Sequence, residues 1–154
     1  MFAYSMREKT HAHRALNDDV PEEVKQNRLR RLIDISMKNQ LERSRMDIGR
    51  YHLVLVDGVG KKEGQLKGKS DTYRTVVFEC PDKISKIRNV SEYQEVTRGE
   101  RERSREEEVK KGDYVIVKID RSTSNTLFGK PICKTDFKTF FELSKGKAYY
   151  TDTD

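Results

Sequence analysis

The strongest constraint on the fold is the stretch Tyr51 to Gly58, YHLVLVDG, which lies between glycines. Val54 and Val56 alternate with leucines in it, and this alternation is typical of a strand that is at least half buried. Two further apolar runs follow, TVVF at residues 75–78 and YVIVKI at residues 114–119, each bounded by turn-forming or charged residues. Short strands separated by such residues predict one small, mainly β barrel.

The composition limits how much of the chain can pack. With 154 residues, of which 38% are charged and 34% hydrophobic, we expect one modest core and several solvated segments. The net charge of +6 favours an anionic partner, either a nucleic acid or a membrane surface. No apolar run approaches the roughly 20 residues that span a bilayer, so we expect no membrane-spanning helix and do not count a membrane among the expected partners.

The sequence contains few residues that could bind a metal ion. The only cysteines, Cys80 and Cys133, are far apart and fit two structural thiols in a reducing compartment. They cannot hold a zinc ion or an iron–sulfur cluster without other ligands. His11 and His13 lack a nearby third ligand, and we interpret them as solvated. The sequence predicts neither a metal site nor a catalytic constellation.

A short strand and a long helix precede the first barrel strand. Phe2 to Ser5 reads as a strand without a hairpin partner, as if it ended a preceding domain. A helix is predicted from about Pro21 to Met46, with acidic residues at its start and Gly49 as its end. One side carries apolar residues four apart, and much of the remainder is basic, which is either a solvated face or a phosphate-contacting one.

Lysines and glycines dominate the segment after the first strand, residues 61–71. Its lysines are candidates to meet a phosphate backbone, and Tyr73 with Arg74 adds an aromatic ring and a cation suited to stacking on a base. A solvated hairpin loop is the alternative. The candidate residues are Lys61, Lys62, Lys67, Lys69, Tyr73 and Arg74.

An insertion at about residues 82–111 interrupts the β pattern. Its first half predicts a short helix or a loosely packed loop, and its second half is nearly all charge, largely solvated, helical or disordered. After the strand at residues 114–119, Leu127 to Lys130 is a final short strand or closing turn. Phe137, Phe140 and Phe141 are expected to dock on the barrel, and residues 142–154 form a disordered tail.

The order of these motifs resembles a known family. FAYSMREKTHA at residues 2–12, followed by VPEEVKQNRLRRL at residues 20–32, is similar to the end of the catalytic domain of the radical S-adenosylmethionine (radical SAM) tRNA methylthiotransferases. The β unit looks like their C-terminal TRAM domain, a small antiparallel OB-like β-barrel that binds tRNA. The likeness covers roughly residues 2–141 and is strongest to the metazoan mitochondrial members named for association with a kinase regulator.

Two departures accompany the resemblance. Lys9 stands where the family commonly has Gly before a Thr, and the CxxxCxxC motif of the radical 4Fe-4S cluster is absent. Without that cluster there is no reductive cleavage of S-adenosylmethionine. The chain therefore resembles a C-terminal piece of such an enzyme: residues 1–48 would be the last strand and helix of a radical SAM α/β barrel, residues 49–141 a TRAM-like barrel, and residues 142–154 a tail.

The resemblance also implies roles for residues. Ser5 and Arg7 would lie beside the substrate or cofactor, and Lys61, Lys62, Lys67, Lys69, Tyr73, Arg74 and Lys118 would contact tRNA. The implied partner is tRNA rather than DNA, and the implied location is mitochondrial, or cytoplasmic otherwise. The chain alone would be non-catalytic, while 4Fe-4S clusters and S-adenosylmethionine belong to the full-length enzymes, which convert isopentenyl-adenosine next to the anticodon to its 2-methylthio form. The alternative is a protein-interaction module whose charged insertion binds a kinase-regulatory protein.

Overall fold

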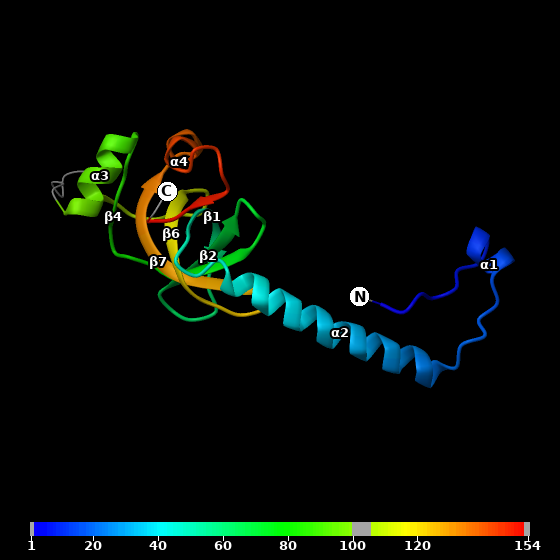
Figure 1. The fold of residues 1–154 in the computed structure, drawn as a ribbon. Coiled ribbons are helices and arrows are strands. Elements are labelled where there is room, and N and C mark those ends of the chain that lie inside the picture. Colours follow the sequence, from blue (N-terminus) through cyan, green and yellow to red (C-terminus); the bar gives the residue numbers. More distant parts are fainter. Residues whose placement is uncertain (1, 100–105, 153–154) are drawn as a thin grey trace. The chain divides into compact units, whose positions relative to one another are not determined.

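The computed structural model describes residues 2–99 and 106–152, which fall into two compact units, Met1–Gln40 and Leu41–Asp154 (Figure 1). Helix α2 (Glu22–Arg45) begins in the first unit, and its last turn belongs to the second. None of the helices in these ranges is long and apolar enough to cross a membrane.

The first unit consists of an N-terminal segment, the short helix α1 (His11–Ala15) and most of α2. The strand predicted for Phe2 to Ser5 is not formed, and Phe2 is 95% exposed. A strand needs a neighbour for its backbone hydrogen bonds, and the part of this unit that is described contains no other strand. The predicted long helix is confirmed, and the chain leaves it through Gly49, whose φ of 85° suits a residue without a side chain.

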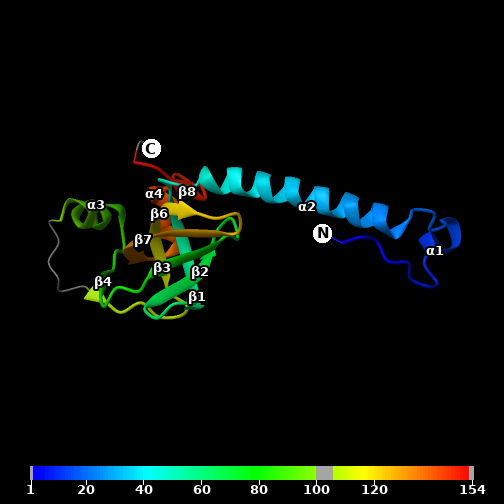
Figure 2. The same cartoon turned by 90° about the horizontal axis from the view of Figure 1, so that it is seen from below.

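The second unit is a closed barrel of five strands, as the sequence predicts. Its strands are β1 (Tyr51–Val59), β2 (Gln65–Ser70), β3 (Thr75–Glu79), β6 (Tyr114–Ser122) and β7 (Thr126–Thr135). They lie in the order β1-β2-β3-β7-β6, and a second pairing between β6 and β1 closes the ring (Figures 1 and 2). All neighbours are antiparallel except β3 and β7, which run parallel. This topology is that of an OB-like fold.

Alternate residues of the strands fill the barrel. Val54, Val76, Val115, Val117 and Leu127 are completely buried there. Two glycines allow the strands to cross closely: a Cβ at Gly68 would collide with the Leu55 carbonyl, and one at Gly129 with the Lys118 carbonyl.

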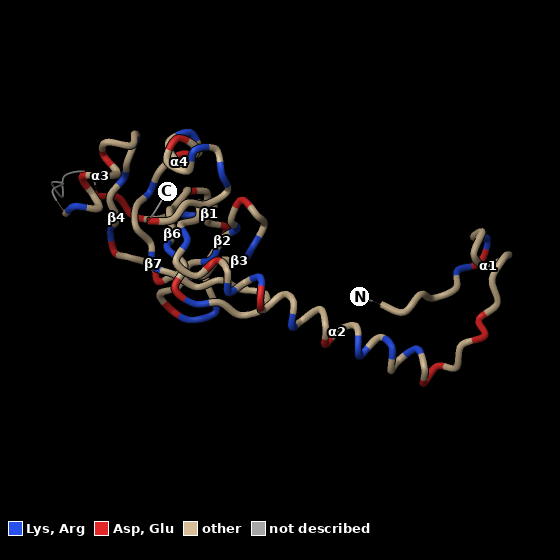
Figure 3. Tube along the Cα trace, in the orientation of Figure 1, with Lys and Arg blue, Asp and Glu red and all other residues tan. Residues whose placement is uncertain are grey.

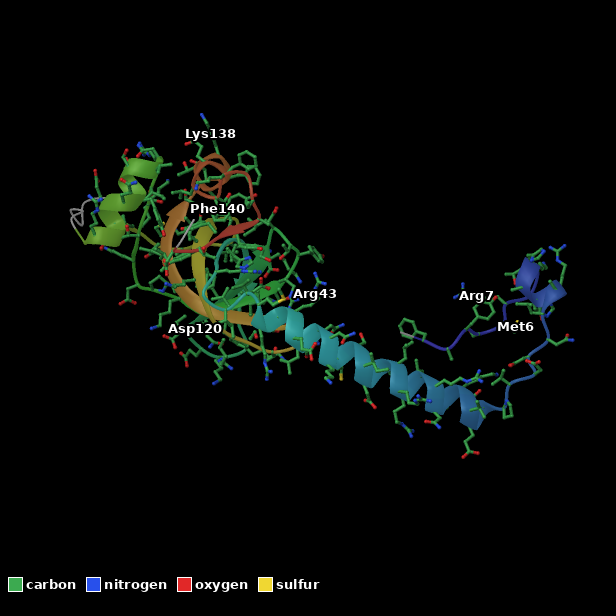
Figure 4. All side chains as sticks on the ribbon, viewed as in Figure 1. Met6, Arg7, Arg43, Asp120, Lys138 and Phe140 are labelled. Atoms are coloured by element: carbon green, nitrogen blue, oxygen red, sulfur yellow. The ribbon has the colours of Figure 1, made fainter. Side chains whose placement is uncertain are left out.

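A second hydrophobic core lies on the outside of the barrel. Helices α3 (Val90–Arg98) and α4 (Phe137–Leu143) and the short strand β8 (Tyr149–Tyr150) contribute to it. Phe140 of α4 is 3% exposed, and in Figure 4 it lies toward the barrel whereas Lys138 of the same helix points away. The core residues are Tyr51, Leu53, Ile87, Ile116, Cys133, Phe140 and Tyr150. We call this side of the barrel the covered side.

Residues 142–152 contain ordered elements where the sequence predicts a disordered tail over residues 142–154, of which 153 and 154 lie outside the described residues. Tyr149–Tyr150 forms β8, which pairs with the start of β1. Tyr150 is 6% exposed, and its ring stacks on Tyr51 with centroids 4.8 Å apart. The aromatic contact supplies the stability that the polar sequence around these two residues does not reveal.

The insertion at residues 82–111 is attached to the barrel at both ends. It contains β4 (Ile84–Ser85), α3 and β5 (Glu106–Glu107), so its first half is helical over residues 90–98 as one of the predicted alternatives, while residues 100–105 lie outside the described residues. Ile84 and Val109 join the barrel core, and the Ile87 N–H donates to the Lys134 carbonyl at 2.8 Å. The ends of the insertion are therefore packed rather than solvated.

Strand β7 is longer than predicted. The sequence indicates a short strand or turn over Leu127 to Lys130, but the strand spans ten residues, Thr126–Thr135. Pro131 lies opposite Val117 where the register with β6 shifts, and a bulge accommodates a residue that has no N–H to donate.

Candidate nucleic-acid interface

Four strands present one row of side chains on the outside of the barrel, away from the covered side's core. Lys67 of β2 pairs with Val77 of β3, Val77 pairs with Phe128 of β7, and Phe128 pairs with Arg121 of β6. Residues paired in this way point to the same face of a sheet. A second row runs beside it through Lys69, Thr75 and Thr126. We call this surface, with the adjoining Tyr73, the open face.

The open face has an aromatic ring next to a cation. The Arg121 guanidinium carbon lies 3.9 Å from the centre of the Phe128 ring, which is the geometry of a cation–π contact. Phe128 is half-buried, and Arg121 is exposed. Both line a groove of about 210 Å³ together with Gln65, Val77, Phe78, Glu79, Asp120, Gly129, Lys130 and Pro131.

Tyr73 is at the turn between β2 and β3, beside this surface. Its side chain is 79% exposed, and its φ of 60° is in the left-handed region that bulky residues rarely adopt. The Lys69 Nζ lies 4.6 Å from the ring centre and donates to the Thr75 hydroxyl at 2.9 Å. Hydrogen bonds hold the turn closed: the Ser70 N–H donates to the Arg74 carbonyl at 2.9 Å, and the Tyr73 N–H to the Ser70 carbonyl at 2.8 Å.

Arg74 is directed inward from the same turn. One guanidinium nitrogen donates to the Ser44 hydroxyl, which in turn donates to the Ser124 carbonyl at 3.1 Å. Ser44 is in the last turn of α2 and is fully buried, and Ser124 is in the turn between β6 and β7. Arg74 therefore joins three segments, and the structure gives it a positioning role beside the open face.

The other sequence-predicted residues are distributed differently. Lys61 and Lys62 are exposed in the turn between β1 and β2. Lys118 lies on the covered side, where its Nζ contacts Asp152 at 2.8 Å and the Tyr51 ring at 4.8 Å. Its hydrogen bonds to Asp152 and Tyr51 raise the pKa of Lys118 despite an opposing desolvation cost. Ser5 and Arg7 are exposed in the N-terminal segment of the first unit. Figure 4 labels Arg7 there.

The structure thus brings together Lys67, Lys69 and Tyr73, and adds Arg121 and Phe128, which the sequence analysis missed. Phe128 follows the buried Leu127, so strict alternation along β7 already places its side chain on the outer face. Charge alone does not single out this surface, because lysine and arginine occur along much of the trace, interspersed with acidic residues (Figure 3). The open face is distinguished by the cations that lie over its Tyr73 and Phe128 rings.

The described residues offer few side chains that could bind a metal ion or an iron–sulfur cluster. Within residues 2–99 and 106–152 there is no group of three or more His, Cys, Asp or Glu side chains that could hold a metal ion. Cys80 is exposed, whereas Cys133 is buried in the covered side's core, and neither forms a disulfide. Because an iron–sulfur cluster is normally held by four thiolates, these two cysteines do not fit one.

Comparison with known proteins identifies the relatives of this chain. No family model matches the chain. Mitochondrial tRNA methylthiotransferase CDK5RAP1 of Homo sapiens is 39% identical over 140 residues, which is 90% of this chain and 21% of that protein. The CDK5RAP1-like protein of Oryza sativa subsp. japonica is 36% identical over 151 residues, 97% of this chain and 23% of the relative.

A bacterial enzyme, the tRNA-2-methylthio-N(6)-dimethylallyladenosine synthase of Chloroherpeton thalassium, is 35% identical over 132 residues, 85% of this chain and 24% of the enzyme. The chain thus spans about a fifth to a quarter of the length of the curated relatives that it matches. The match lies in their C-terminal part, as the resemblance of residues 2–12 and 20–32 predicts. This chain belongs to the tRNA methylthiotransferase family and matches the C-terminal part of its relatives.

Proposed function

We propose that this chain is the tRNA-binding portion of a tRNA methylthiotransferase, and that the open face binds the tRNA. The complete enzyme would convert isopentenyl-adenosine next to the anticodon to its 2-methylthio form. The observation that carries the proposal is the row of Lys67, Val77, Phe128 and Arg121 with the exposed Tyr73 beside it. OB-folds bind oligonucleotides on the face of their second and third strands, which here are β2 and β3 with Lys67, Lys69 and Val77.

The residues of this chain support RNA binding here and catalysis in another part of the enzyme. Lysines on the open face attract phosphates, which orients a nucleic acid without choosing the modified base. The two cysteines do not fit an iron–sulfur cluster. We therefore assign the 4Fe-4S clusters, the S-adenosylmethionine and the sulfur insertion to the part of the enzyme that precedes this chain in its relatives. This chain alone would be non-catalytic.

A mitochondrial location is proposed on the same relationship, because the human relative carries that word in its name. Ser5 and Arg7, at the end of the likeness to the catalytic domain, remain candidates to lie near substrate or cofactor in the complete enzyme.

A salt titration tests RNA binding. The full chain is titrated against an unmodified tRNA by fluorescence anisotropy between low and moderate salt, with a DNA duplex as competitor. The logarithm of the association constant should fall linearly with the logarithm of salt concentration, by about 0.7 to 0.9 per phosphate neutralised. The tRNA should outcompete the duplex. Salt-independent binding, or none at low salt, would contradict the proposal and favour the protein-interaction alternative.

A further inference from the structure

We infer that the open face takes RNA as unpaired nucleotides and holds two bases by stacking, one on Tyr73 and one on the Arg121–Phe128 pair. This inference rests on the proposed function, since it specifies which form of RNA the same surface accepts. Four features of the surface carry it: a strained exposed ring, a groove suited to a base, the spacing of the two positions, and the placement of the lysines.

The conformation of Tyr73 points to a ligand. A bulky residue with φ near 60° costs stability, and Asn or Gly would relieve that cost at the same position. The ring nevertheless projects 79% into solvent. The Lys69 ammonium occupies one region near the ring at 4.6 Å, and the strong exposure leaves ring surface on which a base can stack.

The groove at Phe128 fits a base better than a phosphate. Phe128, Val77 and Pro131 supply an apolar lining, and Arg121 lies over the aromatic ring. Glu79 and Asp120 border the same groove and are exposed, and they balance the charges of Arg121 and Lys130 there. Carboxylates repel a phosphate but accept hydrogen bonds from the exocyclic amino groups of bases. A planar base stacked on the guanidinium would therefore meet complementary groups at its edge.

The two stacking positions lie too far apart for one base. Phe128 pairs with Val77, which follows Tyr73 by four residues along the chain. At about 3.3 Å per residue this is roughly 13 Å, compared with about 3.4 Å between stacked bases. Each ring thus meets a different base of one strand.

The lysines stand at the same two levels of the sheet. Lys69 pairs with Thr75, and Lys67 pairs with Val77. Both point to the open face, where they can neutralise the phosphates that link the two stacked nucleotides. Bases inside a duplex are stacked on each other and expose no faces, so a helical stem would lose both stacking contacts and keep only the phosphate contacts.

The test compares three RNA probes with the full chain by fluorescence anisotropy. They are an unstructured oligoribonucleotide of about 12 residues, a base-paired hairpin of equal length, and an abasic strand with the same number of phosphates. The variants are Tyr73→Asn, which keeps a residue that tolerates a positive φ, and Phe128→Leu, which keeps an apolar side chain. Phe137→Ser, at an aromatic residue of α4 that is 55% exposed, is the matched control.

The wild type should bind the unstructured strand at least about tenfold more tightly than the hairpin or the abasic strand. Tyr73→Asn and Phe128→Leu should each lower that affinity about fivefold to tenfold and leave the salt dependence unchanged, while Phe137→Ser should have no effect. Equal binding of the abasic strand, or wild-type affinity in both variants, would overturn the inference while salt-dependent tRNA binding left the proposed function intact. Absence of tRNA binding would defeat the proposed function itself.

Discussion

The covered side and the open face are formed by the same kind of strand, but the first is buried and the second is exposed to solvent. On β1, Leu53 and Leu55 lie two residues apart and point to the same side of the strand, yet Leu53 is 4% exposed and Leu55 is 38% exposed. The difference is the cover: Leu53 joins the core that α3, α4 and β8 complete, and Leu55 pairs with Lys69 of the open face. Neighbouring elements, rather than the strand sequence, decide which surface remains available to a ligand.

The same contrast holds for charge. On the covered side Lys118 contacts Asp152 at 2.8 Å. On the open face Lys69 contacts a hydroxyl and an aromatic ring, neither of which neutralises its charge. The covered side therefore uses this lysine for an internal ion pair, whereas the open face keeps positive charge for an anion.

The largest expected effect comes from removing the ring that seals the covered side. Tyr150→Ala deletes the ring that stacks on Tyr51 and also contacts Tyr93 and Phe140. We expect a loss of about 3–5 kcal/mol in the free energy of unfolding, measured by urea denaturation of the full chain.

Two variants sharpen that result. Tyr150→Phe keeps the ring and should cost far less than the alanine variant. Tyr73→Asn removes a ring from the open face and should leave stability unchanged or slightly higher, because strain at a positive φ is relieved. Equal destabilisation by Tyr150→Ala and Tyr73→Asn would remove the distinction between the two surfaces.

A smaller effect is expected where both surfaces depend on the closeness of β6 and β7. Gly129→Ala would place a methyl group against the Lys118 carbonyl and the Val117 side chain. A backbone carbonyl cannot move aside as a flexible side chain can, so we expect about 1–3 kcal/mol of destabilisation. Gly58→Ala is the control for the loss of a glycine: like Gly129, Gly58 has no positive φ, but a Cβ there meets only the Lys67 Cε at 3.7 Å. A Gly129→Ala chain as stable as Gly58→Ala would show that the strands can separate.

The sequence predicts the parts of this fold that local patterns encode. Alternation identifies β1, β3 and β6, and the acidic start and glycine end identify α2. Strand β8 is not predictable from the sequence because two tyrosines among Lys, Ala and Thr show no alternation. The strand forms through contacts with Tyr51, about a hundred residues earlier in the chain. The C-terminal half of β7 is not predicted because a proline such as Pro131 usually ends a strand, although here a bulge accommodates it.

The candidate site is predictable to a similar degree. Lys67, Lys69 and Tyr73 belong to one hairpin, so composition finds them together. The pairing of Arg121 with Phe128 depends on the register between β6 and β7, which shifts twice along the ladder. That register is a tertiary property. The same limit applies to Arg74, whose contact with Ser44 cannot be foreseen from the turn that contains it.

The junction between α2 and β1 should also respond to acid. Burial opposes ionisation of Asp47, but the nearby His52 imidazole and the Arg50 guanidinium, which donates to the Asp47 carboxylate at 3.1 Å, outweigh it and hold the pKa of this carboxyl below its ordinary value. His52 is fully buried with its Nε2 3.5 Å from Asp47, and Arg50 stacks on Tyr149 of β8 at 4.0 Å. A lowered pKa stabilises the folded state at pH values above about 4, and this contribution disappears as the pH falls through the folded pKa.

Urea denaturation between pH 6 and pH 2.5 measures this contribution. The wild type should lose more stability than Asp47→Asn over the acidic part of that range, by about 1.4 kcal/mol for each unit by which the pKa is lowered. At pH 6 the variant should be the less stable of the two. Parallel pH profiles for the two proteins would mean that the contacts of Asp47 do not favour its ionised form.

The smallest effect separates the two kinds of lysine. Lys67→Gln removes a charge from the open face and should weaken tRNA binding severalfold at low salt, with a decrease of about one in the salt slope. Lys118→Gln removes a charge that Asp152 already compensates, and binding should change little because the carboxylate it frees lies on the covered side. The two variants carry the same change in net charge, so a general electrostatic attraction would weaken binding equally in both. Equal losses would therefore show that the tRNA senses the total charge of the barrel, and unequal losses in the expected order would assign the phosphate contacts to the open face.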